Sequence, residues 1–221
     1  MSARLRPAAV LFDLDGTLVD SAPDLVAAVA VLCRELGAPP PDAQKVRSVV
    51  SAGGRSMLRA GLPQLDEAAI EVHLARFLAI YAENLGLHTR PYAGIAALLA
   101  ELETRDIVWG IVTNKPGWLA RPLLEQVTLG SRCAALVTGD CLPVRKPDPA
   151  PLLRACELAG VEVNRCVYVG DDLRDIEAGR AAGMPTVAAA WGYLNGSDPA
   201  KWGADLVVAS PVDLLAALGL Q

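Results

Sequence analysis

Two aspartates separated by one leucine follow a short apolar run near the start of the chain, in the stretch VLFDLDGTLVDS at residues 10–21. In an extended chain, side chains two residues apart point to the same side, so Asp13 and Asp15 would face one small volume. Two carboxylates at close range repel each other, and one of them tends to take up a proton. A stable site here therefore requires positive charge from elsewhere in the chain or from a bound cation.

Further polar side chains follow later apolar runs of the sequence. These residues are Thr113, Asn114, Lys146, Asp171, Asp172 and Asp175. In open α/β sheets, ligands bind beyond the carboxyl ends of the strands. We therefore expect these side chains to meet Asp13 and Asp15 at one edge of a sheet.

Clustered aspartates without histidine or cysteine suit a hard cation that prefers oxygen ligands, Mg²⁺ above all. Such a cation would relieve the repulsion between Asp13, Asp15 and Asp171 and would neutralise charge on a phosphoryl group. A carboxylate can attack phosphorus to form an aspartyl-phosphate, and a second carboxyl group can protonate the leaving oxygen and later activate water. Thr113 and Lys146 can hold the phosphoryl oxygens.

The elements that would position these residues are strands alternating with helices. The runs predicted to be short buried strands cover residues 8–12, 108–112, 135–138, 166–169, 186–190 and, more weakly, 206–208. Helices are predicted at 95–103, at 173–182 and after Asp148, which would be an N-cap followed by Pro149 at the first helical position. The continuous apolar strands and their alternation with helices predict an α/β fold with a doubly wound, mostly parallel sheet.

Residues 18–86 break this alternation, because they contain no convincing strand. Their pattern predicts helices at 24–36, 42–50 and 66–85, with Gly53, Gly54 and Arg55 in a turn. The segment is too long for a strand-to-helix connection. We therefore expect a small helical cap at 18–86, inserted into a core formed by residues 1–17 and 87–221.

Taken together, these residues resemble the motifs of one family. The stretch DLDGT at 13–17 resembles the D-x-D-G-T signature of the haloacid dehalogenase-like phosphohydrolases. VTN at 112–114, KP at 146–147 and GDDLRD at 170–175 look like the second, third and fourth motifs of that family, in the same order. The resemblance implies a Rossmann-like core, and the inserted helices are similar to the small helical cap of the family.

The resemblance also implies roles for the acidic residues. Asp13 would be the nucleophile and a Mg²⁺ ligand, and Asp15 would be the general acid and base with its backbone carbonyl on the metal. Asp171 would be the other direct metal ligand. Asp172 and Asp175 would bind the metal through water or support its ligands. The competing interpretation for this last pair is an N-cap with an acidic first helical turn, which we expect to hold in part for Asp172.

The remaining motif residues would bind phosphate, and the cap would choose the substrate. The resemblance assigns phosphate binding to Thr113, Asn114 and Lys146. In the cap, Arg55 would reach a carboxylate or sugar oxygen of the substrate from a loop that also contains Gly54. The competing interpretation is a glycine-rich turn between helices with a solvated arginine.

Within the family, the chain is similar to the phosphoglycolate phosphatase-like group. The stretches VTNKP at 112–116, VGDDLRDIEAGRAAGM at 169–184 and WGADLVV at 202–208 look like the bacterial N-acetylmuramic acid 6-phosphate phosphatases, which act in cell-wall sugar recycling. The resemblance implies a phosphatase for this small sugar phosphate. The alternatives are a phosphatase for phosphoglycolate or another small metabolite, an isomerase of the β-phosphoglucomutase type, and a binding protein without activity.

Composition limits the partners of the chain. Its 221 residues carry a formal net charge of −5, and no basic face indicates a nucleic-acid partner. No apolar stretch approaches the roughly 20 residues of a membrane span. The five cysteines form no C-x-x-C pair, which is typical of reduced thiols. We expect a cytoplasmic protein, a monomer or small homo-oligomer, whose partner is a small phosphorylated metabolite.

Overall fold

A six-stranded parallel sheet forms the centre of the protein in this computed structural model, which describes residues 7–220. The strand order is β5-β4-β1-β6-β7-β8. The strands are β1 (Ala9–Phe12), β4 (Val108–Val112), β5 (Ala135–Val137), β6 (Cys166–Gly170), β7 (Thr186–Ala189) and β8 (Leu206–Val208). Every pair of neighbours runs parallel. The predicted α/β fold and all of its predicted strands are confirmed.

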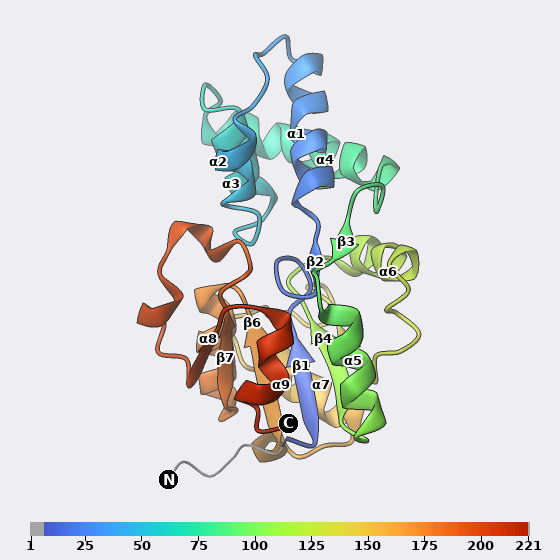
Figure 1. Cartoon of the computed structure of the whole chain (residues 1–221). Coiled ribbons are helices and arrows are strands. Elements are labelled where there is room, and N and C mark those ends of the chain that lie inside the picture. Colours follow the sequence, from blue (N-terminus) through green and yellow to red (C-terminus); the bar gives the residue numbers. More distant parts are fainter. Residues whose placement is uncertain (1–6, 221) are drawn as a thin grey trace.

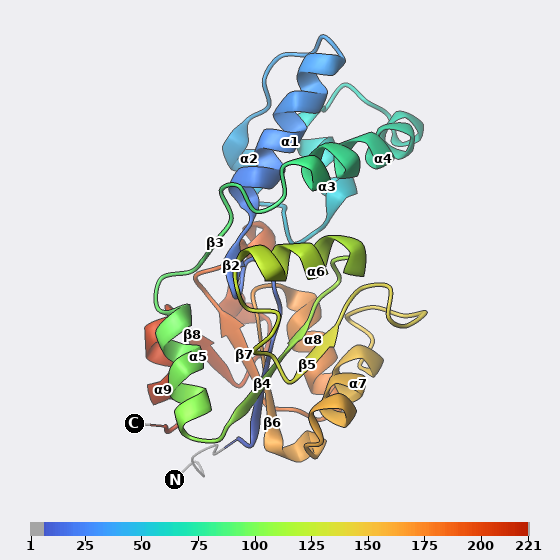
Figure 2. The ribbon, with the colours of Figure 1, turned by 90° about the vertical axis from the view of Figure 1, so that its right-hand side faces the viewer.

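Helices cover both faces of this sheet, as Figures 1 and 2 show. The core helices are α5 (Ile95–Thr104), α6 (Gly117–Gln126), α7 (Ala150–Ala159), α8 (Leu173–Ala182) and α9 (Leu214–Ala217). In the central strand β1, Val10 and Phe12 pack in a cluster with side chains of α5, α6 and α9. Ala9 and Leu11 pack with α7 and α8 in another cluster. Because both faces are covered, the strands read as continuous apolar runs.

Four helices extend beyond the carboxyl end of the sheet, at the top of Figure 1. They are α1 (Ala22–Glu35), α2 (Ala43–Arg47), α3 (Gly54–Gly61) and α4 (Glu67–Glu83). Their buried side chains form a hydrophobic cluster of their own, which Leu119 and Tyr193 join from the core. We call α1–α4 the cap. The boundaries 18 and 86 for this part of the chain stay a prediction.

Two short antiparallel strands carry the chain into and out of the cap. They are β2 (Val19–Asp20) and β3 (Arg90–Pro91), which the sequence pattern did not reveal. Asp24, at the start of α1, accepts hydrogen bonds from the backbone N–H groups of His88 and Thr89 at 2.8 and 3.0 Å and from the Thr89 hydroxyl at 2.6 Å. The two connections are therefore held together by one buried carboxylate.

Several predicted boundaries are wrong in detail. Gly54 and Arg55 are not in a turn but begin α3, and Gly53 is its N-cap with φ +88°. The helix predicted at 42–50 covers only Ala43–Arg47, and turns follow it. Pro149, not Asp148, is the N-cap of α7, although the Asp148 carboxylate still accepts a hydrogen bond from the Ala150 N–H at 2.8 Å. Capping side chains thus fix helix starts only to within a residue or two.

Replacement of Asp24 tests the link between the two connections. Asp24→Ala leaves buried donors of His88 and Thr89 without a partner, so we expect the free energy of unfolding to fall by about 2–3 kcal/mol. Urea denaturation measures this loss. The half-exposed N-cap Asp42 of α2 is the matched control, because Asp42→Ala should cost only about 1 kcal/mol. Equal losses in the two variants would contradict the role given to Asp24.

Candidate active site

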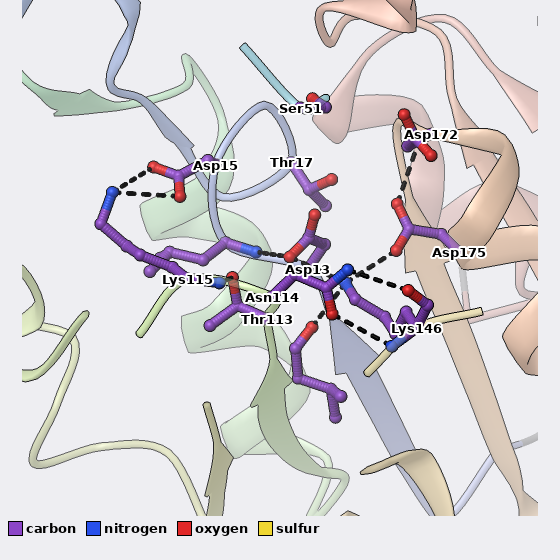
Figure 3. A network of polar contacts seen from close by, with 12 residues as sticks. Asp13, Asp15, Thr17, Ser51, Thr113, Asn114, Lys115, Lys146, Asp172 and Asp175 are labelled. Carbon is purple, nitrogen blue, oxygen red and sulfur yellow. Dashed lines mark hydrogen bonds and ion pairs between the residues drawn. The ribbon is translucent and has the colours of Figure 1, made fainter. Parts of the chain in front are cut away.

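The polar residues that follow the strands do meet at the carboxyl edge of the sheet, below the cap (Figure 3). Asp13 continues β1, and its N–H donates to the Val169 carbonyl of β6 at 2.9 Å. Thr113 continues β4 in the same way, donating to the Val137 carbonyl of β5 at 2.9 Å. The sheet ladder therefore extends into the site and fixes the backbone from which these side chains project.

The Lys146 ammonium lies between two carboxylates. Its Nζ is 2.9 Å from Asp13 Oδ1 and 2.7 Å from Asp175 Oδ1. It also donates to the Val112 carbonyl and to the Tyr168 hydroxyl, both at 2.8 Å. Burial by itself lowers the pKa of this amine, but the two carboxylates outweigh it and raise the pKa. Lys146 is thus a fixed positive charge, with a side chain only 3% exposed.

Asp171 is a fully buried carboxylate that has no basic partner among residues 7–220. It accepts hydrogen bonds from the hydroxyls of Thr17 at 3.0 Å and Ser51 at 2.9 Å, and from the Tyr193 N–H at 2.9 Å. Burial, and then the negative charges of Asp13 and Asp175, raise the pKa of Asp171 well above its usual range. A cation bound at this point would favour the ionised carboxylate that burial and the neighbouring aspartates disfavour.

The chain around Asp171 is packed so closely that side chains would not fit. A Cβ on Gly16, whose φ is +87°, would lie 2.2 Å from Asp171 Oδ2. A Cβ on Gly192 would lie 2.1 Å from the Asp171 Cβ. The glycine of the DLDGT stretch is therefore required both by its left-handed backbone and by the close approach of this carboxylate.

Asp172 and Asp175 form a capping box at the start of α8. Asp172 is the N-cap, and its N–H donates to Asp175 Oδ2 at 3.1 Å. Arg174 pairs with Asp172 at 2.7 Å. Burial raises the pKa of the Asp172 carboxyl, but the hydrogen bonds and positive charge of Arg174 together outweigh burial, and the pKa ends below its usual range. The expected N-cap role of Asp172 is confirmed, and Asp175 reaches inward to Lys146.

Three carboxylates can approach one metal ion. Asp13, Asp171 and Asp175 each offer an oxygen, and these atoms all lie within 4.8 Å of one another. The set consists only of oxygen ligands and is buried, which fits Mg²⁺ better than a metal that prefers nitrogen or sulfur. The predicted set contained Asp15 through its backbone carbonyl, and the carboxylate of Asp15 lies elsewhere. Asp175, predicted to bind the metal through water or to support its ligands, belongs to this cluster and also pairs with Lys146.

The two residues after β4 that were predicted to bind phosphate differ in whether their side chains already have hydrogen-bond partners. The Asn114 amide donates to the Lys146 carbonyl at 3.0 Å and accepts from the Lys146 N–H at 3.1 Å. The nitrogen and the oxygen of the Asn114 amide therefore both bind the backbone of Lys146. Thr113 Oγ1 accepts from the Lys115 N–H at 3.1 Å, and its hydroxyl proton remains available for a phosphoryl oxygen.

Asp15 faces a second buried lysine. Lys115 Nζ lies 3.1 and 3.2 Å from the two carboxylate oxygens and donates to the Tyr81 hydroxyl of α4 at 2.9 Å. The Ser21 hydroxyl donates to Asp15 Oδ1. Burial lowers the pKa of Lys115, but Asp15 and Tyr81 outweigh this, so the pKa is raised. Asp13 and Asp15 thus line one cavity but pair with different lysines, Asp13 with Lys146 and Asp15 with Lys115.

A cavity of about 420 Å³ joins the strand ends to the cap. Polar groups at its base include Asp13, Asp15, Thr113 and Lys146, and its upper wall includes the apolar side chains Leu25, Val50, Met57, Leu74 and Leu78. Gly54 and Arg55, the predicted specificity residues, also line it. The Arg55 guanidinium, however, pairs with Glu71 of α4, with Nη2 2.9 Å from Oε2, and its side chain is 54% exposed.

Sequence reasoning missed the residues that reach the site from the cap. Ser51 donates to Asp171 and its carbonyl accepts from Arg174, whereas Tyr81 holds Lys115. Lys115 directly follows Thr113 and Asn114, so its place at a strand end was a usable signal. Ser51 and Tyr81 carry no local signal, because only the packing of the cap over the sheet brings them near the aspartates.

Comparison with known proteins agrees with this geometry. The family described as "Haloacid dehalogenase-like hydrolase" matches residues 10–189. The chain is 50% identical over 94% of its length to a phosphoglycolate phosphatase of Xanthomonas campestris pv. campestris, covering 95% of that protein. It is 45% identical over 96% of its length to an N-acetylmuramic acid 6-phosphate phosphatase of Pseudomonas aeruginosa, again covering 95% of that protein.

A crystal structure extends the likeness to three dimensions. A predicted phosphoglycolate phosphatase from Haemophilus somnus 129PT matches with a TM-score of 0.85 at 26% identity, over 98% of this chain and 99% of the other. Relatives named as phosphatases confirm the expectation of an enzyme that hydrolyses phosphate esters. The chain belongs to the haloacid dehalogenase-like hydrolase family.

Proposed function

We propose that the protein is a Mg²⁺-dependent phosphomonoesterase that forms an aspartyl-phosphate on Asp13 and acts on N-acetylmuramic acid 6-phosphate. The observation that carries the chemistry is the placement of Asp13 against Lys146, within metal-bridging reach of Asp171 and at the base of a cavity. A carboxylate that is buried, ion-paired and still open to a cavity is suited to attack a bound phosphate ester.

The contacts of Asp13 favour attack by one of its oxygens. Oδ1 receives the Leu14 N–H at 2.7 Å and the Lys146 ammonium at 2.9 Å, which leaves Oδ2 for phosphorus. Lys146 and the Thr113 hydroxyl would hold phosphoryl oxygens during transfer. Asp15 would give a proton to the leaving oxygen and then take one from the water that hydrolyses the aspartyl-phosphate.

Metal binding is part of this proposal. Asp13 and Asp171 would be direct ligands with the Asp15 carbonyl, and Asp172 and Asp175 would support them. Bound Mg²⁺ would neutralise charge on the phosphoryl group and on the carboxylates. Support comes from the buried, unpaired charge of Asp171 and from the short distances within the acidic cluster.

The cavity favours a sugar phosphate over a two-carbon ester. Its volume of about 420 Å³ lies in the range of sites that enclose drug-sized ligands, and its upper wall is apolar. Within the described chain, Arg145 lines this cavity without a carboxylate at ion-pair distance. Arg145 would therefore receive the carboxylate of the muramic acid, and Arg55 would do so in exchange for Glu71. We propose Gly54 and Arg55 as residues of substrate choice.

Phosphoglycolate is the second candidate substrate, because a relative at 50% identity is named for it. An isomerase or a binding protein has less support, since relatives at 45–50% identity are named as phosphatases. A cytoplasmic location, and a monomer or small homo-oligomer, stay predictions. No helix in residues 7–220 is long and apolar enough to cross a membrane.

Replacement of the proposed nucleophile gives the first test of function. Asp13→Asn keeps the shape of the side chain but removes its nucleophilic charge, so we expect turnover to fall by about 10³-fold or more. Steady-state phosphate release measures the loss, and circular dichroism checks that the fold is intact. Retention of full activity by the folded variant would rule out Asp13 as the nucleophile.

Removal of the metal gives a second test with a stability readout. EDTA should abolish phosphate release, and Mg²⁺ should restore it and raise the Tm of the wild type. In Asp171→Asn without Mg²⁺ we expect a stability gain of about 1 kcal/mol, because burial and the charges of Asp13 and Asp175 disfavour the ionised Asp171 carboxylate and an amide does not bear this cost. An amide can keep the contacts to Thr17, Ser51 and Tyr193, since a hydroxyl can also accept.

The same variant should lose the rise in Tm on addition of Mg²⁺. Differential scanning fluorimetry with and without Mg²⁺ compares the two proteins. If Asp171→Asn were less stable than the metal-free wild type, or if Mg²⁺ raised its Tm as much as that of the wild type, the proposed metal site would be wrong.

A substrate panel tests the choice of ester. N-acetylmuramic acid 6-phosphate should show at least about tenfold higher kcat/KM than phosphoglycolate, and Arg55→Ala should reduce this preference by about tenfold through loss of one charged hydrogen bond. Arg59→Ala is the matched control, because Arg59 forms a similar pair with Glu67 but does not line the cavity. A ranking unchanged in Arg55→Ala would leave Arg55 as a surface ion-pair residue.

A further inference from the structure

We propose that Lys115, held by Tyr81 of the cap, is a positioning residue that aims Asp15 at the leaving oxygen of the substrate. This inference rests on the proposed function, because it assigns a part in the same reaction. It concerns a lysine that lies outside the residues expected to bind phosphate or metal. Three elements meet in it: the loop after β1, the loop after β4 and the cap helix α4.

The contacts of Lys115 leave its ammonium no freedom. Nζ lies 3.1 and 3.2 Å from the two oxygens of Asp15 and 2.9 Å from the Tyr81 hydroxyl. It also lies 4.6 Å from the centre of the Tyr81 ring. The side chain is only 6% exposed, so these protein groups are the main partners of the ammonium. An ammonium has three donor hydrogens, and the available acceptors on Asp15 and Tyr81 account for them.

Asp15 in turn depends on Lys115 for its orientation. Within residues 7–220, the Ser21 hydroxyl reaches only Oδ1, and Lys115 supplies the hydrogen bond that Oδ2 receives. Without the lysine, the carboxylate could rotate about its side-chain bonds. A general acid displaced by about 1 Å loses much of its effect, because proton transfer requires hydrogen-bond contact with the leaving oxygen.

The cap decides whether the lysine is in place. Tyr81 is 1% exposed and lies on α4, which packs against α1 within the cap cluster. Its hydroxyl and ring together hold the ammonium over the site. The cap is therefore connected to Asp15 through the Lys115 ammonium and not only through apolar packing.

This role predicts a dependence on the leaving group. An alkoxide leaves only with a proton from the acid, whereas p-nitrophenolate leaves without one. Damage to Asp15 orientation must therefore reduce kcat/KM for alkyl phosphates much more than for p-nitrophenyl phosphate. Damage to phosphate or metal binding would reduce both by the same factor, so the ratio of the two losses identifies the role.

The experiment compares Lys115→Met and Tyr81→Phe with wild type on p-nitrophenyl phosphate, phosphoglycolate and N-acetylmuramic acid 6-phosphate. Asp15→Asn serves as the reference for loss of the acid. Lys45→Met removes a lysine of the cap that is 74% exposed, and Tyr92→Phe removes a buried hydroxyl without a hydrogen-bond partner in the described chain. These two are matched controls and should behave as wild type on every ester.

For Lys115→Met we expect kcat/KM on the alkyl ester to fall by about 10²-fold, and that for p-nitrophenyl phosphate by less than about fivefold. Tyr81→Phe keeps the ring and the lysine and should lose about tenfold on the alkyl ester alone. The inference would be overturned if Lys115→Met and Tyr81→Phe lost the same factor in kcat/KM on both kinds of ester while Asp15→Asn lost more on the alkyl ester than on p-nitrophenyl phosphate. If the wild type hydrolysed none of the esters, the proposed function itself would fail.

Discussion

The repulsion among buried carboxylates at the end of β1 is the constraint on which the rest of the site depends. Asp13, Asp171 and Asp175 lie within reach of one ion, and Lys146 supplies the positive charge that contacts two of them. One ammonium cannot neutralise three carboxylates, and Asp171, whose pKa is raised well above its usual range, forms no ion pair within residues 7–220. The cluster is thus costly without a cation, and relief of this cost would be the source of the proposed metal affinity.

A cluster of this kind needs a backbone that cannot relax. The parallel sheet provides it, since the ladder continues to the N–H groups of Asp13 and Thr113. Gly16 and Gly192 then let the neighbouring loops approach Asp171 more closely than any other residue would allow. The repelling charges stay together because the strands and loops that carry them are fixed by hydrogen bonds and close packing, not because the carboxylates attract one another.

Sequence reasoning identified the residues whose positions follow from strand ends. Asp13, Asp15, Thr113, Lys146 and Asp171 were found in this way, because each lies at or beyond a strand whose apolar character is visible in the chain. The pairing of Arg55 with Glu71 could not be predicted, since it depends on how α3 packs against α4. The contacts of Ser51 and Tyr81 could not be predicted for the same reason. The start of α7 was predicted one residue too early, because Pro149 and not Asp148 is its N-cap.

The division between core and cap also separates the groups for phosphoryl transfer from the groups that face the leaving group. Phosphoryl transfer is the same for every ester, so its groups lie on the sheet, where geometry is most precise. Leaving groups differ in shape and in their need for a proton, and the residues nearest to them come from loops and the cap. Asp15 belongs to both sets: its backbone lies in the loop after β1 and forms a bridge with Val19, but its partner Lys115 is held by α4. In the proposed mechanism, substrate choice and proton transfer would therefore share one contact, that of the buried Lys115 with Asp15 and with Tyr81 of the cap.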